Sequence, residues 1–258
     1  MVEIGFLGTG GAVPTIERDN MSFLLVRNGR ALLVDCPGGA FIKIRKLGVD
    51  PRSVGQIVVT HIHPDHIYGL PAFIHSLMLE EGAVVLWGSA ETVEFCGRLL
   101  DLFGLREKKI RRRVEFRVLA SGGAAELEPG LAVSALSVPH HSSSLAFRLA
   151  LASEGKTIAY SGDTPAHPPF FAWAGGSDVL IHDCSVPSRF FLDFPALAGM
   201  HTNALELGRL SERAGCRLLI PGHFFGEVEY ALSEVEEEIR SGFTGRLLMP
   251  ADLMKVAL

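Results

Sequence analysis

Short apolar runs recur along the chain and predict β-strands, because a strand that is buried on both faces is apolar at almost every position. Gln56-Ile57-Val58-Val59-Thr60 and Leu218-Leu219-Ile220 are two such runs. The same pattern places strands near residues 2–8, 21–27, 30–35, 55–60, 113–120, 131–138, 145–152, 156–161, 178–182 and 216–221.

Four longer segments, near residues 70–80, 89–103, 203–214 and 228–240, repeat apolar residues at helical spacing. Pro71 suits a first helical turn, and Ser89 is a plausible cap of the second segment. Asn203 and Glu206 have capping-box-like spacing at the start of the third. The residues expected on the packed faces are Leu70, Phe73, Ile74 and Leu77; Val93, Cys96, Leu100 and Phe103; Leu207, Leu210 and Ala214; and Val228, Leu232, Val235 and Ile239.

Strands with interspersed helices indicate an α/β protein. Hydrophobic residues make up 48% of the 258 residues and there are 28 glycines, so the chain can build a large core with many tight turns. We find no linker, internal repeat or low-complexity segment, and single α/β domains of this length are routine. We therefore expect one domain over residues 1–258.

The densest chemistry follows the strand near 55–60, in the sequence Thr60-His61-Ile62-His63-Pro64-Asp65-His66. Imidazoles and carboxylates are common ligands of divalent metals, and four of them fall within six residues here. One histidine alone is more often structural than a ligand, but packing hardly explains a run this dense. The ligands would lie at the carboxyl end of a strand, where an open sheet often has its crevice.

The spacing within this motif predicts two metal positions. His61 and His63 are two residues apart, so in an extended chain they point the same way and can share one ion. Asp65 and His66 fall where the chain turns into a helix and can face a second position. Paired metals suit hydrolysis, because they activate a bridging water and hold the oxygens of the scissile group.

Three later segments also place a His or an Asp just after an apolar run: His140-His141, Asp163 and His223. Each one alone could be a turn or a structural histidine. Their recurrence at strand ends, together with the first motif, favours a metal site built from all of them.

Several segments match a known set of motifs. They are Phe6-Leu7-Gly8-Thr9-Gly10-Gly11-Ala12-Val13-Pro14-Thr15, Leu33-Val34-Asp35-Cys36-Pro37-Gly38-Gly39, and the metal motif with its continuation Ile67-Tyr68-Gly69-Leu70-Pro71. From about residue 4 to about residue 227 the chain resembles the metallo-β-lactamase-fold hydrolases, and within them the ribonuclease Z-like phosphodiesterases, with Pro37 where a glycine is more usual. The resemblance implies a four-layer αββα sandwich of two mixed sheets.

By position, the resemblance also implies the ligand set and a metal-bridging hydroxide that Asp65 would orient. His141 is an alternative to His140, but the interval from His140 to Phe147-Arg148 matches the family and favours His140. Zinc suits ligation by His and Asp alone, and manganese or iron would fit too. The implied ligands are His61, His63 and His140 for one ion, Asp65, His66 and His223 for the other, and Asp163 for both.

Two further segments resemble the part of the family's site near the leaving oxygen. Leu180-Ile181-His182-Asp183-Cys184-Ser185 is similar to its His-Glu segment, with Asp183 in place of Glu, and Gly199-Met200-His201-Thr202 to its Gly-His-Ser/Thr segment. A carboxylate beside an imidazole fixes the tautomer and favours the protonated ring, so Asp183 and His201 would form a proton donor. Alternatively, His201 merely precedes the helix that Thr202 or Asn203 caps.

The sequence says less about the identity of the substrate than about the residues of the site. Ribonuclease Z carries a long tRNA-gripping arm between two strands that correspond to those near 145–152 and 156–161, and here only Ser153-Glu154-Gly155 lies between them. This favours a smaller phosphodiester, such as a cyclic nucleotide or a short oligonucleotide, although shorter relatives can still cleave RNA.

Two other functions stay open: a lactone, thioester or sulfate-ester hydrolase on the same centre, or a non-catalytic metal-retaining binding protein. The di-iron redox members of the fold are excluded, because their pattern replaces the second histidine and His63 is present here.

The net charge of −5 argues against a general polyanion binder. The basic run Arg106–Arg113 is either a phosphate contact or a solvated connection, and Ser142, Ser143 and Ser144 either contact substrate or form a turn. The apolar runs are too short to span a membrane, and the chain starts as a strand with no basic segment before it, so we expect a cytoplasmic protein without a signal peptide. Its four cysteines are then buried thiols. The family resemblance implies a homodimer.

Overall fold

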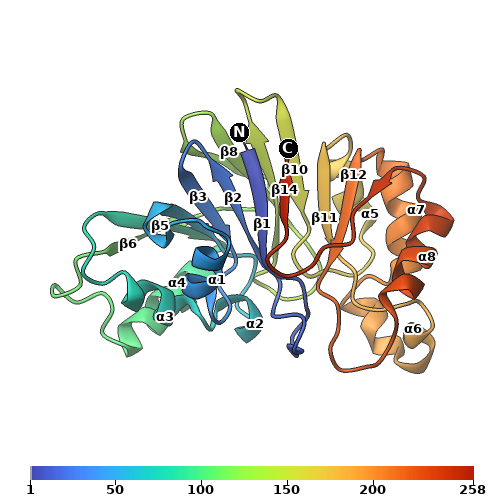
Figure 1. Ribbon diagram of the computed structural model, residues 1–258, viewed down its shortest axis with the longest axis horizontal. Helices are drawn as coiled ribbons and strands as arrows, with labels where there is room; N and C mark the ends of the chain where they lie inside the picture. The colour runs from blue at the N-terminus through green and yellow to red at the C-terminus, as the bar shows by residue number, and fades with distance from the viewer. Residues whose placement is uncertain (1) are drawn as a thin grey trace. The chain divides into compact units, whose positions relative to one another are not determined.

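A computed structural model describes residues 2–258, which form two compact units (Figure 1). The first unit contains the chain up to Ala120 together with Ala251–Leu258, and the second contains Ser121–Pro250. Each unit has one seven-stranded mixed sheet with its own helices, so the expected α/β class with two mixed sheets is confirmed. The single-domain organisation stays a prediction.

The sheet of the first unit combines an antiparallel and a parallel half. The neighbours from β14 to β3 are antiparallel, and those from β3 to β6 are parallel. The parallel half brings the carboxyl ends of β3 and β4 to one edge, where the metal motif begins. In spatial order the strands are β14 (Lys255–Ala257), β1 (Val2–Gly8), β2 (Ser22–Arg27), β3 (Arg30–Val34), β4 (Val54–Val58), β5 (Ala83–Gly88) and β6 (Arg113–Val118).

Helices of the first unit pack against one face of this sheet. Alternate residues of the strands, such as Leu33 and Ile57, join one core cluster with Phe73 and Cys96 of the helices. The alternation follows from the two-residue period of a strand, which sends successive side chains to opposite faces. The helical elements are α1 (Ala40–Lys46), η1 (Pro51–Ser53), α2 (Pro64–Ile67), α3 (Leu70–Ser76) and α4 (Ala90–Leu102).

The sheet of the second unit is antiparallel from β7 to β10 and parallel from β10 to β13. The parallel strands β10, β11 and β12 end side by side; β10 and β12 are each followed by a predicted site residue, and β11 ends on one. In spatial order the strands are β13 (Arg246–Leu247), β12 (Leu218–Gly222), β11 (Val179–Asp183), β10 (Lys156–Tyr160), β9 (Leu145–Leu151), β8 (Leu131–Ser137) and β7 (Ala124–Glu128).

A second core cluster joins this sheet to its helices. Leu180 and Leu219 of the strands pack with Phe170, Leu207 and Ile239 of the helices. In Figure 1, α5, α7 and α8 lie together beside β12, and α6 lies near one end of α8. The helical elements are α5 (Pro168–Ala174), α6 (Phe190–Asp193), η2 (Pro195–Gly199), α7 (Ala204–Ala214) and α8 (Leu232–Gly242).

Caps and packed faces follow the sequence in most places. Ser89 Oγ accepts the Thr92 N–H at 3.2 Å, and Asn203 Oδ1 accepts the Glu206 N–H at 3.0 Å, so both expected caps are confirmed. Phe103 was expected on the packed face of α4 but is 64% exposed, because the helix ends at Leu102 and the chain turns away. Val228 lies before α8, which begins four residues later than expected, at Leu232.

Several short elements have no counterpart in the predicted pattern: β5, β7, α1, α5 and α6, besides the short terminal strands β13 and β14. The apolar run of β5 is short and lies between two predicted helices, so the pattern does not set it apart as a strand. The helices α1, α5 and α6 have at most seven residues, too few for helical periodicity to stand out.

The basic run is largely bound to the protein itself. The guanidinium of the buried Arg112 donates to the carbonyl oxygens of Glu81, Arg52 and Val54 at 3.0–3.2 Å. Arg106 and Arg111 form ion pairs with Asp101 and Glu81. These contacts favour the structural interpretation of Arg106–Arg113 over a phosphate contact.

The four cysteines are buried free thiols, as expected. Within residues 2–258, no helix combines the length and the apolarity that a membrane span requires.

Candidate active site

The first motif forms a compact cluster of ligands at the end of β4. His61 and His63 follow the strand, and His63 is the N-cap residue of α2, whose first residue is Pro64. His61 Nε2 lies 3.1 Å from His63 Nδ1, so two ring nitrogens converge on one point. The i, i+2 spacing therefore brings these two side chains together, as predicted.

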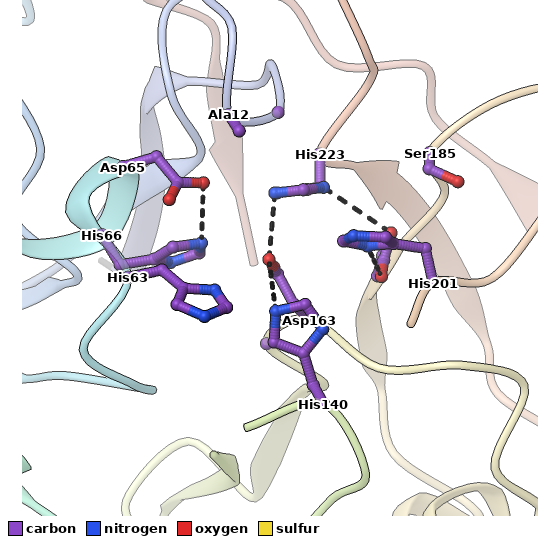
Figure 2. Close-up of polar contacts among 12 residues, drawn as sticks. Ala12, His63, Asp65, His66, His140, Asp163, Ser185, His201 and His223 are labelled. Carbon is purple, nitrogen blue, oxygen red and sulfur yellow. Dashed lines mark hydrogen bonds and ion pairs between the residues drawn. The ribbon is translucent and has the colours of Figure 1, made fainter. Parts of the chain in front are cut away.

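Asp65 and His66 lie on α2 and point to a second position. His66 Nε2 is 3.4 Å from Asp65 Oδ2 (Figure 2), whereas His66 Nδ1 is 2.9 Å from Asp35 Oδ2. Because a carboxylate only accepts, Nδ1 donates to Asp35, and this tautomer leaves the Nε2 lone pair on the side of Asp65.

Asp35 is a site residue that the sequence analysis did not identify as one. It follows β3 in the left-handed conformation, with φ 57°, which is unusual for a residue other than glycine. Its carboxylate accepts the Thr60 N–H at 2.8 Å and the Thr60 hydroxyl at 3.0 Å, besides the His66 ring. Burial raises the pKa of Asp35, while His66 and Thr60 oppose this by hydrogen bonding. Asp35 therefore fixes the orientation of His66.

An Asp35→Asn variant is expected to lower the affinity of the protein for divalent metal by about 10- to 100-fold, the usual effect of removing a partner of a metal-ligating histidine. The asparagine amide keeps the shape of the side chain but carries no negative charge, so its oxygen accepts the His66 Nδ1–H more weakly. Competition with a chromogenic chelator measures the affinity. Asp101→Asn, a surface residue of the same unit, is the matched control, and equal affinities of the two variants would contradict this role for Asp35.

In the second unit, His140 and His223 both face the carboxylate of Asp163. Asp163 Oδ2 is 3.0 Å from His223 Nε2 and 3.7 Å from His140 Nε2 (Figure 2). The three residues follow β8, β10 and β12, so the ends of separate strands supply them. His223 has φ 64°, a strained conformation that is concentrated at functional sites.

His140 and His141 point to different partners, which decides between them. His140 Nδ1 donates to the Met200 carbonyl oxygen at 2.9 Å, so its Nε2 carries the lone pair on the side of Asp163. Burial lowers the pKa of His140, which favours the neutral ring that a metal ligand requires. His141 Nδ1 instead lies 2.9 Å from the Ser143 hydroxyl, and Ser144 Oγ accepts the His141 N–H. Ser143 and Ser144 thus form the turn, and the geometry favours His140 as the ligand.

Asp183 and His201 form the expected pair. His201 Nδ1 donates to Asp183 Oδ2 at 2.9 Å, so the shorter side chain of Asp still reaches the imidazole. The Thr164 N–H donates to the same oxygen at 3.1 Å and holds the carboxylate in place. The His201 ring stacks on His223 with centroids 5.1 Å apart, so the pair lies directly beside the ligand cluster of this unit.

His182 lies on the opposite face of β11 from Asp183. It is buried and stacks on Phe171 with centroids 4.7 Å apart, and burial lowers its pKa to about 4. The alternation of side chains along a strand therefore sends the carboxylate to the site and the neutral imidazole to the core.

The donors of both units fit a divalent metal. Imidazole nitrogens and carboxylate oxygens are the atoms that converge, and second partners orient them: Asp35 for His66 and the Met200 carbonyl for His140. Side-chain atoms of His140, Asp163 and His201 lie within 4.8 Å of one another, as do those of Asp183, His201 and His223, so the pair of Asp183 and His201 is in reach of the ligand cluster. A metal ion bound here would polarise a phosphoryl oxygen and activate water.

Comparison with known proteins extends over nearly the whole chain. Ribonuclease Z of Methanosarcina acetivorans is 26% identical over 308 aligned positions, which cover 100% of this chain and 98% of that protein. The metallo-β-lactamase fold protein YhfI from Bacillus subtilis superposes with a TM-score of 0.82 at 20% identity, covering 99% of this chain and 98% of YhfI. The short form of human tRNase Z superposes with a TM-score of 0.79 at 19% identity, with the same coverage.

These matches establish a ribonuclease Z-like protein with the metallo-β-lactamase fold, as the motifs predicted. A narrower assignment comes from the sequence profile of the Anti-Pycsar protein Apyc1 family, which matches residues 2–220. That match spans most of the 258 residues and includes every strand end that carries a candidate ligand except the one before His223. The chain therefore belongs to the Anti-Pycsar protein Apyc1 family.

Proposed function

We propose that the protein is a binuclear metal-dependent phosphodiesterase whose two ligand clusters complete one centre. The relationship to ribonuclease Z makes the chain a metal-dependent hydrolase, so the proposal concerns the centre and the substrate. The convergence of His140 and His223 on the Asp163 carboxylate carries it, because a carboxylate with an imidazole on either side suits a ligand shared by two ions. His61 and His63 would complete the first ion, and Asp65 and His66 the second, with zinc as the expected metal.

The side chains divide the reaction between them. Two bound ions would lower the pKa of a water molecule and neutralise charge on the phosphoryl oxygens. Asp65 orients the attacking water by accepting its hydrogen bond. The water loses one proton to solvent as its oxygen bonds to phosphorus, the bond to the leaving oxygen breaks, and His201 gives the leaving oxygen a proton that it regains from solvent. The Asp183 carboxylate accepts the Nδ1–H of His201 at 2.9 Å and orients the ring so that Nε2 is the nitrogen that donates.

A small phosphodiester, such as a cyclic nucleotide or a short oligonucleotide, is the proposed substrate. Strands β9 and β10 pair from Leu151–Lys156 onward and form a tight hairpin, at the position where ribonuclease Z proper would carry its arm. The alignment with the Methanosarcina acetivorans enzyme spans about 50 more positions than this chain has residues. This difference in length supports the proposal that the chain lacks segments which that enzyme has. We further propose a homodimer, which a monomer in sedimentation at micromolar concentration would contradict.

The reaction class is tested by comparing bis(p-nitrophenyl) phosphate with p-nitrophenyl acetate and a lactone, using zinc- or manganese-loaded protein. We expect the phosphodiester to be turned over fastest, and only with metal present. Faster turnover of the acyl esters, or of a sulfate ester, would assign another hydrolase. Tight binding of an unconverted phosphodiester, with the metal content verified, would identify a binding protein instead.

The substrate class is tested with a 3′,5′-cyclic nucleotide and a tRNA precursor that carries a 3′ trailer. Without the arm, the precursor lacks a gripping surface, so we expect kcat/KM to be higher for the cyclic nucleotide. Faster cleavage of the precursor would contradict a small substrate while leaving the phosphodiesterase assignment intact.

A further inference from the structure

A pocket of about 350 Å³ opens in the second unit, and one of its lining residues, Phe225, contacts His201. Its volume falls within the range of small-molecule sites. The lining is almost wholly apolar and includes three phenylalanines. Among its residues only Glu227 is charged, and the pocket is lined by Val186, Phe190, Phe194, Ala196, Leu197, Phe225, Glu227 and Val228.

One wall of the pocket contacts the imidazole of the proposed proton donor. The Phe225 ring lies edge-on to His201, with centroids 5.0 Å apart, and to His223 at 5.9 Å. The backbone of His201 is joined to the pocket as well, because its backbone N–H donates to the carbonyl oxygen of Leu197 at 2.8 Å. The Phe225 ring is therefore shared by the pocket and the proposed proton donor.

The aromatic walls are fixed by hydrogen bonds. The Phe225 N–H donates to the Ser185 carbonyl oxygen at 2.9 Å, and the Tyr230 hydroxyl contacts the carbonyl oxygens of Ser185 and Phe225 at 3.1 and 3.2 Å. The Phe190 ring packs edge-on against Tyr230. Because these contacts already order the walls, binding a flat, rigid group would cost little side-chain entropy, and the pocket is preorganised for such a group.

The segment that carries Phe190 and Phe194 is tied to α8. The Ser188 hydroxyl donates to Glu238 Oε1 and its N–H donates to Glu238 Oε2, both at 2.7 Å. Arg189 forms an ion pair with Glu234 and lies over the Phe190 ring at 4.0 Å. These anchors hold α6 and η2 as one wall, and leave the Phe194 side chain 52% exposed at its edge.

We propose that this pocket binds the base of the nucleotide substrate by stacking on its phenylalanines, an inference that rests on the proposed phosphodiesterase function. Every nucleobase has an apolar aromatic face, and base–aromatic stacking tolerates any base. Because the lining offers almost no hydrogen-bonding atoms, the pocket recognises that a base is present without distinguishing one base from another. The enzyme is thus selective for nucleotides over phosphodiesters without a base.

Phe194 is the residue to vary, because it lines the pocket without contacting His201. Phe194→Ala is expected to raise KM for a 3′,5′-cyclic nucleotide by about 10- to 100-fold, as loss of one stacking ring does, with kcat nearly unchanged. Hydrolysis of the matched cyclic phosphate of 1-O-methyl ribose, which has no base, is expected to stay the same. Phe194→Leu, which keeps apolar volume but loses the ring, is expected to fall between the alanine variant and the wild type.

Leu192→Ala is the matched control, because Leu192 lies on α6 only two residues before Phe194, is 83% exposed and is outside the lining. Equal losses on the cyclic nucleotide and on the abasic phosphate, or wild-type KM values in Phe194→Ala, would overturn the pocket proposal. If the wild type hydrolyses neither substrate, the proposed function fails, and adenosine binding by calorimetry then decides the pocket. Binding that Phe194→Ala weakens supports the pocket, and undetectable adenosine binding to the wild type contradicts it.

Discussion

Replacing Asp163 with alanine is expected to lower metal-dependent phosphodiester hydrolysis by about a thousandfold or more, the loss of several kcal/mol of transition-state stabilisation by the metals. Asp163 follows β10, is buried, and has His140 and His223 on either side of one oxygen. The Asp163 carboxylate thus has both imidazoles as partners, whereas Asp183 reaches His223 at 3.8 Å. Removal of Asp163 therefore disturbs both proposed metal positions at once.

The loss has to be separated from unfolding, because Asp163 is buried. Asp163→Asn keeps the volume and is expected to lose activity almost as completely, since the amide supplies weaker and less basic ligand atoms. Asp178→Asn is the matched control: Asp178 accepts the Thr157 N–H at 2.9 Å in the same unit but outside the ligand cluster. Chemical denaturation reports folding. An Asp163→Asn protein that folds, binds metal and keeps wild-type turnover would remove Asp163 from the centre.

Replacing His201 with alanine is expected to affect substrates according to their leaving group. For a cyclic nucleotide, which expels an alkoxide, we expect a loss of about 10²- to 10⁴-fold in kcat, the usual contribution of a general acid. For the p-nitrophenyl ester of thymidine 5′-phosphate, whose leaving phenolate departs without a proton, we expect a change of less than about tenfold. The difference between the two substrates isolates proton donation from substrate binding.

The companion variant Asp183→Asn is expected to show the same dependence on the leaving group with a smaller loss, because the imidazole remains but its tautomer is less firmly fixed. Single-turnover kinetics on both substrates measure these effects. A loss of equal size on the alkyl and aryl substrates in His201→Ala would show that His201 binds substrate or supports the fold. This is the result expected if His201 merely precedes the helix that Asn203 caps.

The metal motif could be predicted from sequence because its geometry is local. Two histidines two residues apart in extended chain converge by backbone geometry alone, and the structure places His61 Nε2 and His63 Nδ1 3.1 Å apart. His140, Asp163 and His223 are distant in sequence, yet each follows an apolar run that ends at the same edge of one sheet. The pairing of His201 with Asp183 needed the family resemblance, because eighteen residues separate them.

Other site features depend on contacts that no local pattern encodes. Asp35 reads as an ordinary polar residue after a strand, and its hydrogen bond to His66 spans 31 residues. The segment Leu33–Gly39, which contains Asp35, resembles the corresponding segment of the family, but that resemblance alone assigns no role to the carboxylate. Likewise, His182 and Asp183 are adjacent in sequence, and without the family resemblance no local pattern shows which of them faces the site. The pocket at Phe194 depends on where η2 packs, which apolar periodicity over so short a segment does not specify.

The most direct test of the central claim is a titration of metal-free protein with zinc, followed by phosphodiester hydrolysis and by elemental analysis of the bound metal. We expect two ions per chain and activity that reaches its plateau only when the second ion binds, because both clusters contribute to one proposed centre. Full activity with one ion per chain, or hydrolysis by protein verified as metal-free, would contradict it.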